Sequence, residues 1–120
     1  MPPITPDAAI DGLMSVVKRL QQSHCAHIRV ANMSSAVPGD SVHAYLGFPE
    51  TLSHRIRRFN LALVDAAQTA DFSIIDIDRI VAHGGAERLL VDPIHFTPDG
   101  CRRIALEVAR ILEDRGVIEF

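Results

Sequence analysis

One short segment of the sequence carries residue types suited to acid–base catalysis: Asp92 and His95 lie three positions apart, just before Thr97. A histidine that acts as a general base needs a carboxylate on one ring nitrogen, because that carboxylate fixes the tautomer and stabilises the imidazolium. An Asp-x-x-His turn can place both groups at one edge of a sheet, and Pro93 would stiffen such a turn. We therefore predict that Asp92 and His95 are catalytic residues, beside a helix that Thr97 anchors.

Helices and strands must position this pair. Two predicted helices open on the same residue types, Thr5-Pro6-Asp7 and Thr97-Pro98-Asp99. These residues supply an N-cap, a proline at the first helical position and an acidic group in the first turn. A loop is expected between the second strand and the last helix. The other predicted elements are a helix from about 49, strands over 27–33, 72–77 and 117–120, and a loop over 34–48.

The second predicted strand indicates the fold class. Phe72-Ser73-Ile74-Ile75-Asp76-Ile77 is a nearly continuous apolar run, typical of a strand covered on both faces in a parallel sheet. Strands that alternate with helices predict a three-layer α/β fold with a partial parallel sheet. Two firm strands fall short of the roughly five of an average sheet, and a bare sheet edge is an association site. We predict that residues 1–120 form a single partial domain, completed by another polypeptide or by a second copy of the chain.

Composition excludes several classes of function. The chain has 120 residues, of which 48% are hydrophobic and 22% charged, and these values suit one folded domain. A net charge of −3 gives no reason to expect nucleic acid or an anionic membrane as a partner. We read neither a membrane-spanning run nor a secretory signal in the sequence, so we expect a cytoplasmic protein. Cys25 and Cys101 are then expected to be free thiols.

The segment that contains Asp92 and His95 resembles the last conserved block of the SGNH (GDSL-type) hydrolases. The order of elements before it, including Arg58-Phe59-Asn60 at a helix and the strand near Phe72, is similar to the C-terminal half of that family, over roughly Ala8 to Leu112. The resemblance implies a flavodoxin-like half-domain in which Asp92 and His95 serve a Ser-His-Asp triad. It also implies acyl-ester hydrolysis or acyl transfer on a small acyl substrate, without a cofactor or a metal.

The other blocks of the family do not match this sequence. The sequence has no Gly-x-Asn-Asp, which in the family helps to build the oxyanion hole. Gly39-Asp40-Ser41 is present, but it follows the first predicted strand, whereas the family needs most of its sheet between the serine and His95. We interpret Ser41 as part of a surface turn. A partner chain is therefore predicted to bring the serine nucleophile and the oxyanion hole.

Two other interpretations of the whole chain stay open. The chain could be a non-catalytic interaction subunit derived from an SGNH hydrolase, with Asp92 and His95 kept as a buried hydrogen-bonded pair for packing. It could also be a fragment of a longer enzyme. A neighbouring reading frame with Gly-Asp-Ser and Gly-x-Asn-Asp but without Asp-x-x-His would favour the split hydrolase.

Several other polar residues have two interpretations each. His24-Cys25-x-His27 could be metal ligands, although no matching ligand pair follows. Asn32 and Ser34-Ser35 could line a pocket at the end of a strand, or cap the loop there. Asp76 and Asp78 are expected to be structural. The arginines of the middle helix are expected to form a solvated face or a partner contact: Arg55, Arg57 and Arg58.

Overall fold

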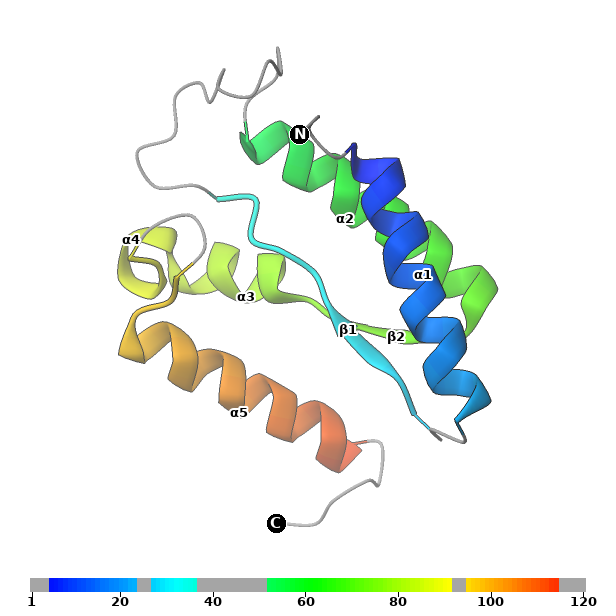
Figure 1. Ribbon diagram of the computed structural model, residues 1–120. Coiled ribbons are helices and arrows are strands. Elements are labelled where there is room, and N and C mark those ends of the chain that lie inside the picture. The colour runs from blue at the N-terminus through cyan, green and yellow to red at the C-terminus, as the bar shows by residue number, and fades with distance from the viewer. Residues whose placement is uncertain (1–4, 24–26, 37–51, 92–94, 115–120) are drawn as a thin grey trace.

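The computed structural model of the protein describes residues 5–23, 27–36, 52–91 and 95–114. These residues form a mixed α/β fold with a small parallel sheet and a large helical content (Figure 1). The elements, in chain order, are α1 (Pro6–Gln22), β1 (Arg29–Ala31), α2 (Leu52–Ala70), β2 (Ser73–Ile75), α3 (Ile77–Gly84), α4 (Ala86–Leu89) and α5 (Pro98–Asp114).

The two strands pair in parallel, with Val30 opposite Ile74. Two further backbone bonds extend the pairing, from Ser73 N to the Ile28 carbonyl at 3.1 Å and from Asn32 N to the Ile75 carbonyl at 3.1 Å. Both strands are shorter than predicted. The second strand ends at Ile75 because the next residue, Asp76, caps α3, which begins at Ile77.

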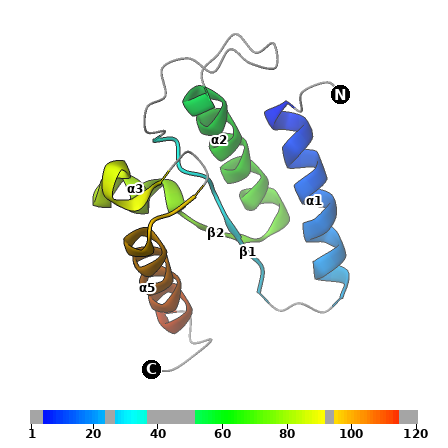
Figure 2. The same ribbon diagram turned by 60° about the vertical axis from the view of Figure 1, so that its left-hand side comes forward.

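Helices α1 and α2 lie side by side and cover one face of the strand pair (Figures 1 and 2). The predicted N-cap of α1 is confirmed, since Thr5 Oγ1 accepts a hydrogen bond from Ala8 N at 3.1 Å. At the other end of α1, Gln21 Nε2 donates to the Ala70 carbonyl at 2.5 Å and ties the helix to the end of α2. The larger core of the protein lies between these helices and the strands. Its buried members are Ile10, Val17, Leu63 and Phe72.

The expected loop after the second strand is wrong, because most of this segment is helical. Asp76 caps α3 by accepting a hydrogen bond from Arg79 N at 3.0 Å, and Ile77 and Val81 bury one face of the helix. Gly85, at φ 90°, separates α3 from the short α4, and this conformation suits glycine alone. The segment predicted as a loop therefore forms two helices: a carboxylate caps the first, and a glycine separates it from the second.

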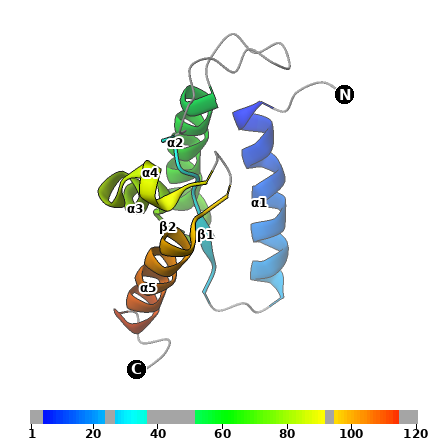
Figure 3. The same ribbon diagram turned by 90° about the vertical axis from the view of Figure 1, so that its left-hand side faces the viewer.

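A second, smaller core joins α3 to α5. Ile77, Val81 and Leu90 are its buried members, and Phe96 and Ile104 pack against them. Helix α5 lies on the opposite side of the strands from α1 (Figure 3) and packs against α3 and α4. None of the helices in the described ranges is long and apolar enough to cross a membrane. The predicted start of α2 at 49–51 and the predicted strand over 117–120 lie outside the described residues.

The packing of α2 leads to a first prediction, which compares two leucines of the same helix. Leu63 is 0% exposed in the larger core and Leu61 is 70% exposed. We expect Leu63→Ala to lower the free energy of unfolding by about 3 kcal/mol, through lost apolar burial and a cavity. Leu61→Ala is expected to change it by less than about 0.5 kcal/mol. Urea unfolding followed by circular dichroism, at one fixed protein concentration, measures both, and equal effects would contradict the assigned core.

Candidate functional site

His95 lies on an extended segment that closes back on the end of α4. Leu90 and Phe96 form an antiparallel bridge, and Val91 N donates to the His95 carbonyl at 2.9 Å. Phe96 packs into the smaller core, while His95 is exposed. The backbone of His95 is therefore held by the bond from Val91 and by the packing of Phe96, and His95 itself is exposed to solvent.

The start of α5 fixes the other end of this segment. Thr97 N donates to the Leu89 carbonyl at 2.9 Å, and Thr97 Oγ1 donates to the Arg88 carbonyl at 2.6 Å. The same hydroxyl accepts a hydrogen bond from Gly100 N at 3.0 Å, as predicted for an N-cap. Position 100 requires glycine, because a Cβ there would lie only 2.2 Å from the Leu89 carbonyl oxygen. The Thr-Pro-Asp-Gly sequence thus joins α5 to the end of α4 at close range.

The other predicted member of the acid–base pair, Asp92, lies outside the described residues, and so does the Gly39-Asp40-Ser41 turn. The distance between Asp92 and His95 therefore stays a prediction. The exposure of His95 matches the accessibility that a general base needs. The exposure of His95 differs from the burial expected of an Asp92–His95 pair that is kept only for packing.

A network of side-chain hydrogen bonds occupies the carboxyl ends of the two strands. Asn32 Nδ2 donates to Asp76 Oδ1 at 2.9 Å, and Asn32 Oδ1 accepts from Asp78 N at 3.0 Å. Asp78 Oδ1 in turn accepts from both N and Oγ of Ser35, at 2.7 and 2.8 Å. Asp76 and Asp78 thus have the structural role expected of them. Ser35 holds the loop after β1 against the start of α3 through its two bonds to Asp78.

Asn60 of α2 holds the same loop from the other side. Its Oδ1 accepts from Met33 N at 3.1 Å and its Nδ2 donates to the Met33 carbonyl at 2.7 Å, so one amide satisfies both backbone groups of one residue. Ser53 Oγ adds a bond to the Ser35 carbonyl at 2.5 Å. This role of Asn60 was not predicted from the sequence. A polar amide in an otherwise apolar helical stretch was the available signal.

An apolar groove of about 460 Å³ lies between the end of β1 and the first turns of α5. Asn32 and Ser34 line it, so these residues border a pocket as well as holding the loop. Cys101, a free and exposed thiol, also lines the groove, whereas Cys25 lies outside the described residues. The remaining lining residues are apolar: Ala31, Met33, Ile77, Phe96, Ile104 and Ala105.

Within the described ranges, no three His, Cys, Asp or Glu side chains gather as metal ligands would. His27 is exposed, and His24 and Cys25 of the same motif lie outside those ranges. Of the three arginines expected to form a solvated face of α2, Arg57 and Arg58 are exposed and Arg55 is half-buried. Comparison with protein families, with curated proteins and with solved structures finds no match to the chain.

The close approach at Gly100 leads to a second prediction. We expect Gly100→Ala to destabilise the protein by about 1–3 kcal/mol, because the added methyl group meets a backbone oxygen that must move. Amide hydrogen exchange at Val91 and Thr97, the donors next to the bridge, should accelerate. Gly12→Ala in α1 is the control, since nothing lies within 4 Å of its Cβ and the change should stabilise the helix by up to about 1 kcal/mol. Stabilisation by both substitutions would contradict the contact.

Proposed function

We propose that this chain is the C-terminal part, or a subunit, of a split SGNH-type serine hydrolase. In this proposal Asp92 and His95 supply the acid–base pair, and a partner chain carries the Gly-Asp-Ser and Gly-x-Asn-Asp blocks. The observation that carries the proposal is the exposed His95 on an anchored segment directly before a helix. A base that receives a proton from another chain must be accessible, yet fixed in position.

The form of the sheet supports the same proposal. Among the described residues, the two short parallel strands have unpaired edges, and the apolar groove beside the end of β1 runs between Met33 and Ile104. An unpaired strand next to apolar side chains is a surface that another strand can extend. In the proposed assembly, the partner lengthens the sheet to complete a three-layer SGNH fold, with α1 and α2 on one face and α5 on the other.

The proposed chemistry is acyl transfer through a serine ester. His95 would take the proton from the partner's serine as that hydroxyl attacks the ester carbonyl, and would return the proton to the leaving alcohol. Water would then be activated by the same imidazole and release the acyl group. Asp92 would hold the tautomer of His95 and stabilise its charged form, and donors on the partner would stabilise the oxyanion.

A third prediction concerns the chain on its own. We expect the purified chain to self-associate or to form mixed species, because the sheet that the described residues form has only two strands and open edges next to apolar surface. Sedimentation velocity over a range of protein concentrations measures this behaviour. A compact monomer with one cooperative melting transition at all concentrations would contradict the proposed completion by a partner.

A fourth prediction concerns activity. The chain alone should hydrolyse a simple acyl ester no faster than the uncatalysed rate, and the complex with the serine-bearing partner should do so faster. In that complex, His95→Ala should lower turnover by roughly 10⁴–10⁶-fold, as triad removals do. Asp92→Asn should cost the same or less, because it spoils the tautomer and leaves the base in place.

Ser41→Ala is the matched control in the same complex, and it should leave turnover nearly unchanged. Loss of activity in Ser41→Ala would place the nucleophile in this chain. Full activity in His95→Ala would instead support a non-catalytic interaction subunit, because the reaction would then proceed without the proposed base.

A further inference from the structure

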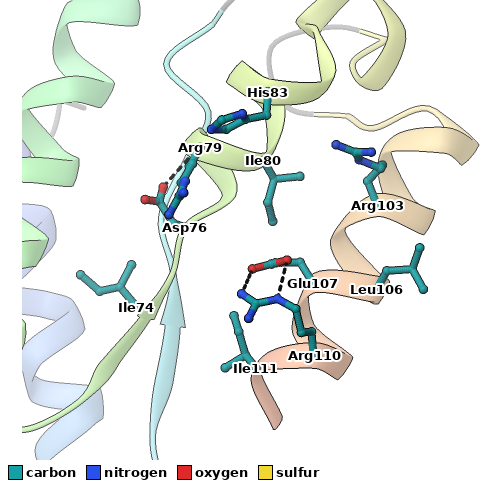
Figure 4. Close-up of a pocket in the computed structure, with 10 residues that line it drawn as sticks. All are labelled: Ile74, Asp76, Arg79, Ile80, His83, Arg103, Leu106, Glu107, Arg110 and Ile111. Carbon is teal, nitrogen blue, oxygen red and sulfur yellow. Dashed lines mark hydrogen bonds and ion pairs between the residues drawn. The ribbon is translucent and has the colours of Figure 1, made fainter. Parts of the chain in front are cut away.

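A second hollow, the cleft between α3 and α5, lies apart from the His95 segment (Figure 4). It has a volume of about 690 Å³, within the usual range of small-molecule pockets. Arg79 and His83 lie one turn apart on α3, and Arg103 extends from α5 towards that helix (Figure 4). Two facing helices thus bring three nitrogen-rich side chains to one cleft.

The cationic side chains of this cleft differ in whether they have partners. Arg110 is fully engaged, because it bonds to Glu107 through two nitrogens and to Asp114 at 2.8 Å through a third. Across the described part of the chain, the side chains of Arg79, His83 and Arg103 make no hydrogen bond or ion pair, although the charges of both arginines help to lower the pKa of the Glu107 carboxyl. Two arginines and one histidine therefore offer donors to a ligand.

The carboxylates of the cleft are already occupied. Hydrogen bonds from Arg110 lower the pKa of the Glu107 carboxyl, so Glu107 stays ionised and pairs with that arginine. Asp76 Oδ1 accepts from Asn32 Nδ2 and from the backbone N of Arg79. With three arginines against two carboxylates, the cleft has a positive balance in a chain whose net charge is −3. This local reversal of sign favours an anion over a cation.

The floor of the cleft is apolar. Ile74 of β2, Ile80 of α3 and Ile111 of α5 line it among the charged side chains (Figure 4). All three are partly exposed, so a ligand that covers them removes apolar surface from water. We propose that the cleft between α3 and α5 binds a small amphipathic anion, with its carboxylate or phosphate at the basic side chains of Arg79 and Arg103 and its apolar part on Ile74, Ile80 and Ile111.

Guanidinium groups suit this role because each can give two parallel hydrogen bonds to a carboxylate or a phosphate. His83 adds one ring N–H donor at the same end of the cleft. The proposal is independent of the split-hydrolase function, since it involves neither the Asp92–His95 pair nor a serine-bearing partner. Activity assays and binding assays can therefore fail separately.

A fifth prediction tests the cleft by equilibrium dialysis of the full chain against radiolabelled octanoate, below the concentration at which octanoate forms micelles. We expect saturable binding. Acetate and octan-1-ol should each compete much more weakly than unlabelled octanoate, because one lacks the apolar part and the other the charge. Octyl phosphate should compete at least as well as octanoate, and inorganic phosphate should resemble acetate.

Variants locate the site. Arg79→Gln and Arg103→Gln should each weaken octanoate binding by about fivefold or more, because each removes a charge-assisted contact. Arg103→Lys keeps the charge and should lose less than Arg103→Gln. Arg102→Gln is the matched control, since Arg102 is adjacent in α5 but pairs with Asp99 and lies outside the cleft, and it should stay within about twofold of the unchanged chain. All of these arginines are exposed, and circular dichroism confirms that each variant is folded.

Four outcomes would overturn the proposal. Octanoate could fail to saturate the chain. Octan-1-ol could compete as well as octanoate, which would make the site purely apolar, or acetate could do so, which would make it a site for any anion. Finally, Arg102→Gln could weaken binding as much as Arg103→Gln, which would reduce the effect to the net charge of the chain.

Discussion

The side-chain amide of Asn32 joins the end of β1 to the start of α3, and the arrangement of α3, α4 and α5 follows from that junction. Its nitrogen donates to the carboxylate that caps α3, and its oxygen accepts from a backbone nitrogen in the first turn of the helix. These two bonds fix the direction in which the chain continues from β2 into α3. Because α4 and α5 pack on α3, the same amide determines where the His95 segment lies relative to the sheet. One partly buried hydrogen-bond network at the carboxyl ends of the strands thus couples the strands to the candidate site.

The packing of the protein is uneven on the two sides of the strands. On one side, α1 and α2 enclose the larger core, in which Val17 and Leu63 are almost fully buried. On the other side, α5 is held mainly through α3 and α4, and α5 borders both an apolar groove and a charged cleft. Close-packed interiors leave few such spaces, so hollows along one helix indicate surface that is available to other molecules.

These two hollows differ in chemistry and therefore in the occupants that we propose. The groove beside β1 is almost wholly apolar and lies next to a strand whose other edge is unpaired among the described residues, which suits a protein partner that extends the sheet. The cleft beside β2 combines three isoleucines with two arginines that form no ion pair within the described ranges, which suits a small amphipathic anion. His95 lies on the segment that leads into α5, so the proposed catalytic base and both hollows share one supporting helix.

Local sequence determined the starts of two helices and the class of the fold. Thr5 caps α1 and Thr97 bonds the start of α5 because a hydroxyl, a proline and an acidic residue act within one turn. Alternating strands and helices likewise predicted a parallel pair, which the structure contains. Only the tertiary structure decided that α3 exists, that Asn60 bonds to the backbone of Met33, and that Arg79 and Arg103 line one cleft. Each of these depends on groups distant in sequence: the cap of α3 is held by Asn32, 44 residues before it, and the cleft needs two helices to meet. Spacing along a chain reveals contacts within one turn or one strand, whereas contacts between elements arise only when packing has brought them together.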